Sequence, residues 1–183
     1  LFFINSAFAK DPKEFISEIT NATSEILKEN ISTEEKVEKL ILIAENAVDI
    51  DGIGLYSLGK HRKIITDEQL NRYKTIFREY FLKSFSSRLS QYSDPQINVI
   101  SQNVVNEKYT IVSSILVETT ERPELKIDWR VYTKDKNRPL IRDLIIEGLS
   151  LARTQKEEFN SVIQGADGDV NALLKNLENF NSK

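Results

Sequence analysis

The spacing of hydrophobic residues changes twice along this chain, and the two changes constrain the fold more than any other feature. Up to about residue 92, apolar residues recur every three or four positions, as on one face of a helix. Between Ile97 and Ile146 they alternate with polar residues, as in strands, and after Gly148 the helical spacing returns. The order helices, strands, helices predicts an α+β fold with the long helices packed on one face of a sheet.

Capping signals mark the starts of the helices that precede the sheet. Ser32 followed by Glu35, and Thr66 followed by Gln69, each match the capping box, in which two side chains satisfy free backbone N–H groups. Pro95 ends the last of these helices, because the residue before a proline avoids the helical conformation. We therefore expect helices over residues 11–29, from 32 through 44, over 51–58 and over 66–92.

Four alternating segments follow, separated by turn signals such as Asn106-Glu107. Consecutive strands with short connections form an antiparallel meander. The expected fold is therefore α+β, with a four-stranded antiparallel sheet, several helices packed on it, and helices at both ends of the chain. The strands are expected at Ile97–Val105, Tyr109–Thr119, Leu125–Thr133 and Pro139–Ile146.

The composition excludes several kinds of site. The chain has no cysteine, which rules out disulfides, thiolate nucleophiles and zinc–thiolate centres. The single histidine, His61, argues against His-based triads and multi-histidine metal sites. A net charge of −3 with mixed acids and bases gives no footprint for nucleic acid. No later run approaches the roughly 18 apolar residues of a membrane span, so stable membrane insertion is not expected.

The first nine residues, LFFINSAFA, have the character of a secretory signal. They carry no charge and end in Ala7-Phe8-Ala9, the small-bulky-small pattern that precedes a cleavage site. We expect residues 1–9 to be the remnant of a truncated signal peptide and the mature chain to begin at Lys10, in the periplasm. A buried N-terminal strand is the alternative. No linker or repeat divides residues 10–183, which are expected to form one domain.

Three motifs together resemble the MlaC, or toluene-tolerance, family. The first is the spaced series Asp49-Ile50, Ile53-Gly54 and Leu58-Gly59. The second is the Phe-rich stretch FREYFLKSFSSRLSQY, residues 77–92, and the third is DLIIEGLSL, residues 143–151, followed by Glu158-Phe159. The resemblance covers residues 36–163 in the family's order. Arg62 and Pro139 stand where relatives usually carry tryptophans, a departure that bears on the shape of a cavity mouth.

The resemblance implies a fold and a function. The fold is a curved sheet like that of nuclear transport factors, with acyl chains held in an apolar cavity between sheet and helices. The function is that of the periplasmic phospholipid carrier of an ABC-type lipid transport system, which maintains outer-membrane lipid asymmetry. The implied partners are a phospholipid ligand, an outer-membrane lipoprotein complex, and an inner-membrane ABC transporter complex with its lipid-binding subunit. No cofactor, metal or catalytic residue is implied.

The residues themselves indicate where such a cavity would lie. In residues 125–132, apolar and polar side chains alternate, so one face of this strand is apolar. Residues 110–117 are apolar on both faces, and the sequence does not decide which of these faces meets a ligand. The long helix supplies aromatic side chains opposite the sheet. For each of these side chains, packing in a filled core is the alternative. The candidate ligand-binding residues are Ile53, Tyr73, Phe77, Tyr80, Phe81, Phe85, Val112, Leu116, Ile127, Trp129, Val131, Leu144 and Ile146.

Three other functions are compatible with the sequence. An enzyme on the same fold would need a buried acid in an apolar pocket, with Asp128 or Asp143 as candidates and Tyr132 or His61 as helpers. A protein-interaction module would have a closed cavity, and a carrier of another cargo, such as a hopanoid, would need a wide, rigid pocket.

The basic run at residues 60–63 could neutralise a lipid phosphate or an acidic partner, although a solvated loop is the favoured interpretation. Side chains two residues apart on a helix point in different directions, so Asp49 and Asp51 would not bind one metal ion together. Asp49 is interpreted instead as the cap of the helix that follows.

Overall fold

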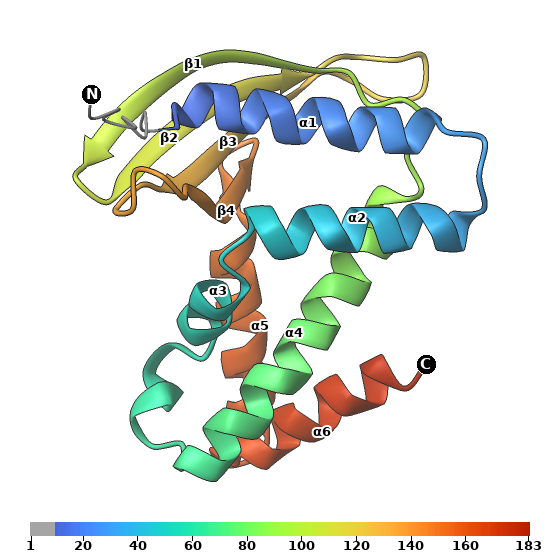
Figure 1. Cartoon of the computed structure of the whole chain (residues 1–183). Helices are drawn as coiled ribbons and strands as arrows, with labels where there is room; N and C mark the ends of the chain where they lie inside the picture. Colours follow the sequence, from blue (N-terminus) through green and yellow to red (C-terminus); the bar gives the residue numbers. More distant parts are fainter. Residues whose placement is uncertain (1–9) are drawn as a thin grey trace, which may run out of the picture.

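The computed structural model describes residues 10–183 (Figure 1), so the predicted signal remnant at residues 1–9 lies outside the described residues. The chain runs through helices, then strands, then helices again, as expected. The elements are α1 (Pro12–Lys28), α2 (Thr33–Ala47), α3 (Ile50–Ser57), the 3₁₀ helix η1 (Gly59–Lys63), α4 (Asp67–Leu89), β1 (Ile97–Asn106), β2 (Tyr109–Leu116), β3 (Leu125–Tyr132), β4 (Leu140–Ile146), β5 (Leu149–Ser150), α5 (Leu151–Gly165) and α6 (Val170–Asn181).

Both predicted capping boxes are present. The side chain of Ser32 accepts a hydrogen bond from the backbone N–H of Glu35, and the side chain of Glu35 accepts one from the backbone N–H of Ser32. Thr66 and Gln69 form the same pair of bonds at the start of α4. The predicted end of the long helix at Tyr92 is wrong, because α4 ends at Leu89. Backbone N–H groups there bond to carbonyls three residues back, as in Tyr92 N to Leu89 O, so the chain leaves the α-helix in a tight turn.

The sheet is an antiparallel meander in the order β1-β2-β3-β4-β5. The prediction of four strands is wrong by one. β5 has only two residues and pairs with Ile145 and Ile146 across a tight turn at Glu147 and Gly148. Both turn residues have positive φ, 48° and 81°, as a two-residue hairpin of this kind requires. A strand of two residues leaves no alternation to detect, which is why the sequence pattern missed it.

Each of the four predicted strands also differs from the structure at one end: β1 ends at Asn106 and not at Val105, and β3 ends at Tyr132 and not at Thr133. β2 ends at Leu116 and not at Thr119, because the chain turns at Thr119, which forms an isolated bridge with Arg122. β4 begins at Leu140 and not at Pro139, which has no N–H to donate to a ladder.

The helices form two groups around one curved sheet. α1 packs along β1 and β2, whereas α4 packs on α2, α3 and α6 and runs away from the sheet, so that only its C-terminal end comes near (Figure 1). The expectation that all long helices lie on the sheet face is therefore wrong for α4. The second half of α4 and the strands β3 and β4 line one hollow, which is described below.

Candidate functional site

Asp49 ties α3 to the sheet. Its backbone N–H donates to the carbonyl of Ile141 in β4 at 2.9 Å, and its Oδ1 accepts from the N–H of Gly52 at 2.9 Å, which caps α3. A Cβ on Gly52 would lie 2.5 Å from Asp49 Oδ2, so only glycine lets the carboxylate approach this closely. The prediction that Asp49 is a helix cap is confirmed. The cap fixes the position of Ile53, which comes one turn later.

Gly54 brings α3 into close contact with α4. A Cβ at this position would lie 2.7 Å from Cδ1 of Phe77, and the Tyr73 hydroxyl donates to the Gly54 carbonyl oxygen at 2.9 Å. Tyr73 has no exposed surface. Burial, with a smaller effect from Tyr80, raises the pKa of Tyr73 far above its ordinary value.

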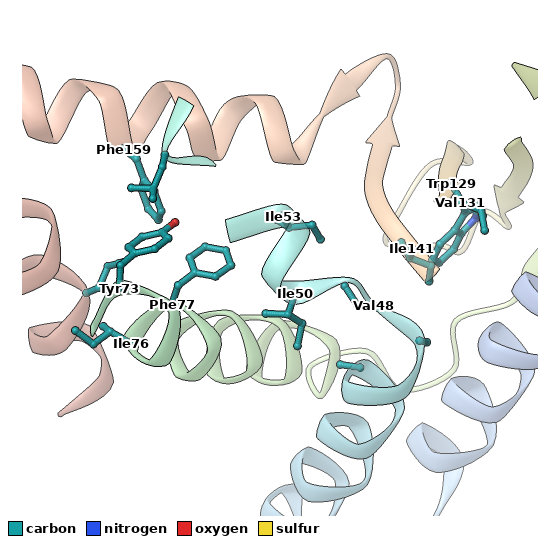
Figure 2. Close-up of a cluster of buried hydrophobic side chains, with 14 of the residues drawn as sticks. Val48, Ile50, Ile53, Tyr73, Ile76, Phe77, Trp129, Val131, Ile141 and Phe159 are labelled. Carbon is teal, nitrogen blue, oxygen red and sulfur yellow. The ribbon is translucent and has the colours of Figure 1, made fainter. Parts of the chain in front are cut away.

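Aromatic rings fill the space between α3, α4 and α5. Tyr73 and Phe77 stack at 5.5 Å between ring centroids, and Phe159 of α5 meets both edge-on at 6.4 and 6.1 Å. In Figure 2 these three side chains point toward one another, while Trp129 and Ile141 lie at the sheet beyond Ile53. This packed group, Tyr73, Phe77 and Phe159, is called the aromatic cluster below.

A hollow of about 220 Å³ opens between the aromatic cluster and the sheet. Its apolar walls come from five elements, α3, α4, β3, β4 and α5, and from Val48, which precedes α3. The exposed side chains Arg88 and Glu158 also line it and mark where it meets solvent. The apolar lining consists of Val48, Ile53, Phe77, Tyr80, Phe81, Phe85, Trp129, Ile141, Leu144, Leu151 and Ala152.

Phe81 and Phe85 form the wall contributed by the second half of α4. Their rings stack at 5.8 Å with an angle of 10° between planes, and both side chains are only partly buried. Trp129 faces the hollow from β3 and is held in place by a hydrogen bond of 2.8 Å from its indole N–H to Ser114 Oγ. The hollow therefore has a rigid sheet wall and a less constrained helix wall.

Seven of the thirteen candidate ligand-binding residues line the hollow: Ile53, Phe77, Tyr80, Phe81, Phe85, Trp129 and Leu144. The other six lie in or against the hydrophobic core: Tyr73, Val112, Leu116, Ile127, Val131 and Ile146. On β2 the face carrying Val112 and Leu116 is buried and the opposite face is half-buried, but neither face lines the hollow. That any of the thirteen contacts a ligand stays a prediction.

The lining also includes residues that the sequence analysis did not single out. Ser84 and Arg88 continue the helical spacing that begins at Tyr80, and Gln155 follows Leu151 by one turn on α5. Their helical spacing could have identified these residues, but polar side chains at such positions are usually exposed to solvent. Gln155 accepts a hydrogen bond of 3.1 Å from the Tyr80 hydroxyl.

The carboxylates considered for catalysis have structural partners. Asp143 is buried and accepts hydrogen bonds from Ser150 Oγ at 2.6 Å and from the backbone N–H of Ala152 at 3.0 Å, which joins the β4–β5 hairpin to α5. Asp128 accepts from Ser113 Oγ at 2.6 Å and pairs with Lys126. Neither Asp128 nor Tyr132 lines the hollow.

The basic run at residues 60–63 is not a loop. It forms η1, in which His61 is buried with its Nε2 at 3.0 Å from Asn160 Oδ1, while the three flanking basic residues are exposed. His61 lies outside the hollow. Within residues 10–183, no cluster of three or more His, Asp or Glu side chains could hold a metal ion. None of the described helices combines the length and the apolar character that a bilayer span needs.

Comparison with known proteins adds two findings. A family model described as "MlaC protein" matches residues 17–179. A solved structure described as the phospholipid-binding protein from Ralstonia solanacearum, in complex with a phospholipid, superposes with a TM-score of 0.79 at 18% sequence identity. The match covers 94% of this chain and 98% of the other, so the two share a fold. No curated protein matches the chain.

Proposed function

Because this chain belongs to the MlaC family, we propose that it is a non-catalytic phospholipid carrier that holds acyl chains in the hollow. The observation that carries the proposal is the apolar hollow between Phe81 and Phe85 of α4 and Trp129 and Leu144 of the sheet. An acyl chain has no hydrogen-bonding groups, so it suits walls made of aromatic and aliphatic side chains. The structural neighbour, a phospholipid-binding protein with the same fold, supports this choice of cargo.

The size of the hollow indicates that it widens on loading. Its volume of about 220 Å³ lies below the roughly 300–1,000 Å³ of typical small-molecule pockets. Phe81 and Phe85 are partly exposed and contact each other, so they can rotate away without opening the aromatic cluster. The sheet wall stays in place because Trp129 is anchored to Ser114. Loading therefore moves the helix wall.

The energetics suit a carrier that must also release its cargo. Each methylene kept from water contributes about 0.8 kcal/mol, so exposing some thirty methylenes of two chains would cost on the order of 20 kcal/mol. The chains are already dry in a bilayer, so their transfer into a dry hollow is close to neutral. Non-directional contacts of this kind accept chains of several lengths.

The location and the partners are further parts of the proposal. A carrier of this family works in the periplasm, which agrees with a signal remnant at residues 1–9 and one lipid-binding domain over residues 10–183. It passes lipid between an outer-membrane complex and an inner-membrane ABC transporter complex and so maintains outer-membrane lipid asymmetry. The hydrogen bonds that occupy Asp143 and Asp128 favour a carrier over a cavity enzyme.

Native mass spectrometry of the purified protein tests the proposal. We expect a bound species with the mass of a phospholipid. Phe81→Asp should lose this species, because it places a charge against the acyl chains. The matched control is Leu42→Asp, since Leu42 is 59% exposed on α2 and does not line the hollow.

Three results would contradict the proposal. Absence of any bound lipid would favour an interaction module. A bound species of another chemical class would change the cargo. An equal loss of lipid in both variants would show that the hollow is not where the lipid binds.

A further inference from the structure

A second, more polar recess adjoins the hollow. It has a volume of about 390 Å³ and lies between α3, η1 and the face of the sheet opposite Trp129. Three arginines line it, Arg62 from η1, Arg130 from β3 and Arg142 from β4, together with Tyr56 and Tyr109. Arg142, Asp143 and Ala152 line both spaces and form the wall between them.

Two of the three arginines in this recess have no acidic partner within the part of the chain that the structure describes. Among residues 10–183, neither Arg62 nor Arg130 forms an ion pair or a side-chain hydrogen bond, and both are exposed. The one carboxylate in the lining, Asp143, already accepts from Ser150 and from the backbone of Ala152. Two guanidinium groups therefore remain available to a ligand.

Arg142 is held rigidly in the recess. Its Nε donates to Asp49 Oδ2 at 2.5 Å, its Nη1 donates to the Tyr109 hydroxyl at 2.8 Å, and its guanidinium lies 3.7 Å from the centre of the Tyr132 ring. Its Nη2 has no hydrogen-bond partner among the described residues. A guanidinium whose position is already fixed loses little conformational entropy when it binds a ligand.

We propose that this recess binds a phosphate group between Arg62, Arg130 and Nη2 of Arg142. Guanidinium groups present N–H donors in a planar fork that matches the oxygens of a phosphate. One arginine satisfies a carboxylate, whereas three arginines from three elements suit a tetrahedral anion with several oxygens. The volume leaves room for the alcohol esterified to it.

The phosphate has two possible sources with the same chemistry. It is either the head-group phosphate of the carried lipid, which rests on the proposed function, or a free phosphate ester. Arg142, Asp143 and Ala152 line both spaces, so the recess lies next to the acyl-chain hollow.

Calorimetric titration of delipidated protein with sn-glycerol 3-phosphate tests the site, with glycerol as the uncharged control. We expect glycerol 3-phosphate to bind and glycerol not to bind. The double variant Arg62→Gln/Arg130→Gln should weaken binding by about tenfold or more, because charge-assisted hydrogen bonds are lost. Arg138→Gln is the matched control, since Arg138 is exposed and lies outside the recess. Absence of binding, or equal affinity in the double variant, would overturn the proposal.

Titration of protein loaded with phospholipid then separates the two sources. If loading blocks glycerol 3-phosphate, the head group occupies the recess, and if loaded protein still binds it, the ligand is a free ester. Native mass spectrometry of the double variant distinguishes failure of this site from failure of the carrier function. A variant that keeps its lipid but has wild-type affinity for glycerol 3-phosphate overturns the phosphate site alone.

Discussion

The two halves of α4 carry the same aromatic stripe but lie in different surroundings. In the first half, Tyr73 is 0% exposed and Phe77 is 2% exposed, because Gly54 lets α3 approach and Phe159 fills the remaining space. In the second half, Phe81 and Phe85 are partly exposed and face a hollow. The first half therefore contributes mainly to stability and the second half to the capacity to hold a ligand.

Truncating one ring that packs against the first half of α4, Phe159 of α5, and one ring of the second half, Phe85, should give the largest contrast. We expect Phe159→Ala to lower the free energy of unfolding by about 3–5 kcal/mol, because it opens a cavity in a fully packed cluster. Phe85→Ala should lower it by about 1 kcal/mol, since its ring is partly exposed and already borders empty space. Denaturant unfolding of both variants measures the difference, and equal effects would mean that the two halves are equally packed.

Two glycine substitutions test the close approach of α3 to α4. Gly54→Ala should destabilise the protein by about 1–3 kcal/mol, because the new methyl group overlaps the Phe77 ring. Gly165→Ala is the control. It lies at the end of α5 with nothing within 4 Å of an added Cβ, and it should stabilise by about 0.4–1 kcal/mol. Thermal unfolding reports both signs, and a neutral Gly54→Ala would remove the proposed reason for this glycine.

Tyr73 makes the packed half sensitive to alkaline pH. Burial raises its pKa in the folded protein, so the stability it contributes is fully present below the ordinary tyrosine pKa of about 10. That stability falls as the pH rises above this value, because the unfolded chain releases the proton first. Burial, followed by Glu158, also raises the pKa of Tyr80.

Tyr73→Phe should lower stability by about 1–2 kcal/mol at neutral pH, because the Gly54 carbonyl oxygen loses its donor. It should also reduce the loss of stability above pH ~10, with Tyr80 contributing the slope that remains. Urea unfolding at several pH values measures both effects. An unchanged slope would show that Tyr73 does not titrate with unfolding.

Local signals in the sequence predicted most of the fold. The capping boxes at Ser32 and Thr66 predicted two helix starts because both partners of each box lie within one turn of the chain. The hairpin at Glu147 and Gly148 was missed because its second strand is too short to alternate. Capping boxes can be predicted from sequence because they depend only on residues that are close together in the chain.

The hollow could be predicted only in part, for a physical reason. Tyr73 and Phe81 lie on the same stripe, and periodicity cannot distinguish a ring with a partner opposite it from a ring without one. Residues 110–117 are apolar on both faces, so alternation could not tell that the face of Val112 and Leu116 is the buried one or what covers it. The basic recess combines Arg62, Arg130 and Arg142 from three separate elements, which no local pattern brings together.

Fluorescence of Trp129 shows directly whether acyl chains occupy the hollow, because Trp129 is the only tryptophan in the chain and lines the hollow. Protein loaded with a phosphatidylcholine brominated in its acyl chains is compared with protein loaded with the same lipid without bromine. Bromine quenches tryptophan only near contact, so we expect strong quenching at one lipid per protein. If brominated lipid is bound, as verified by native mass spectrometry, and the fluorescence is unchanged, the acyl chains lie elsewhere and the hollow is not their binding site.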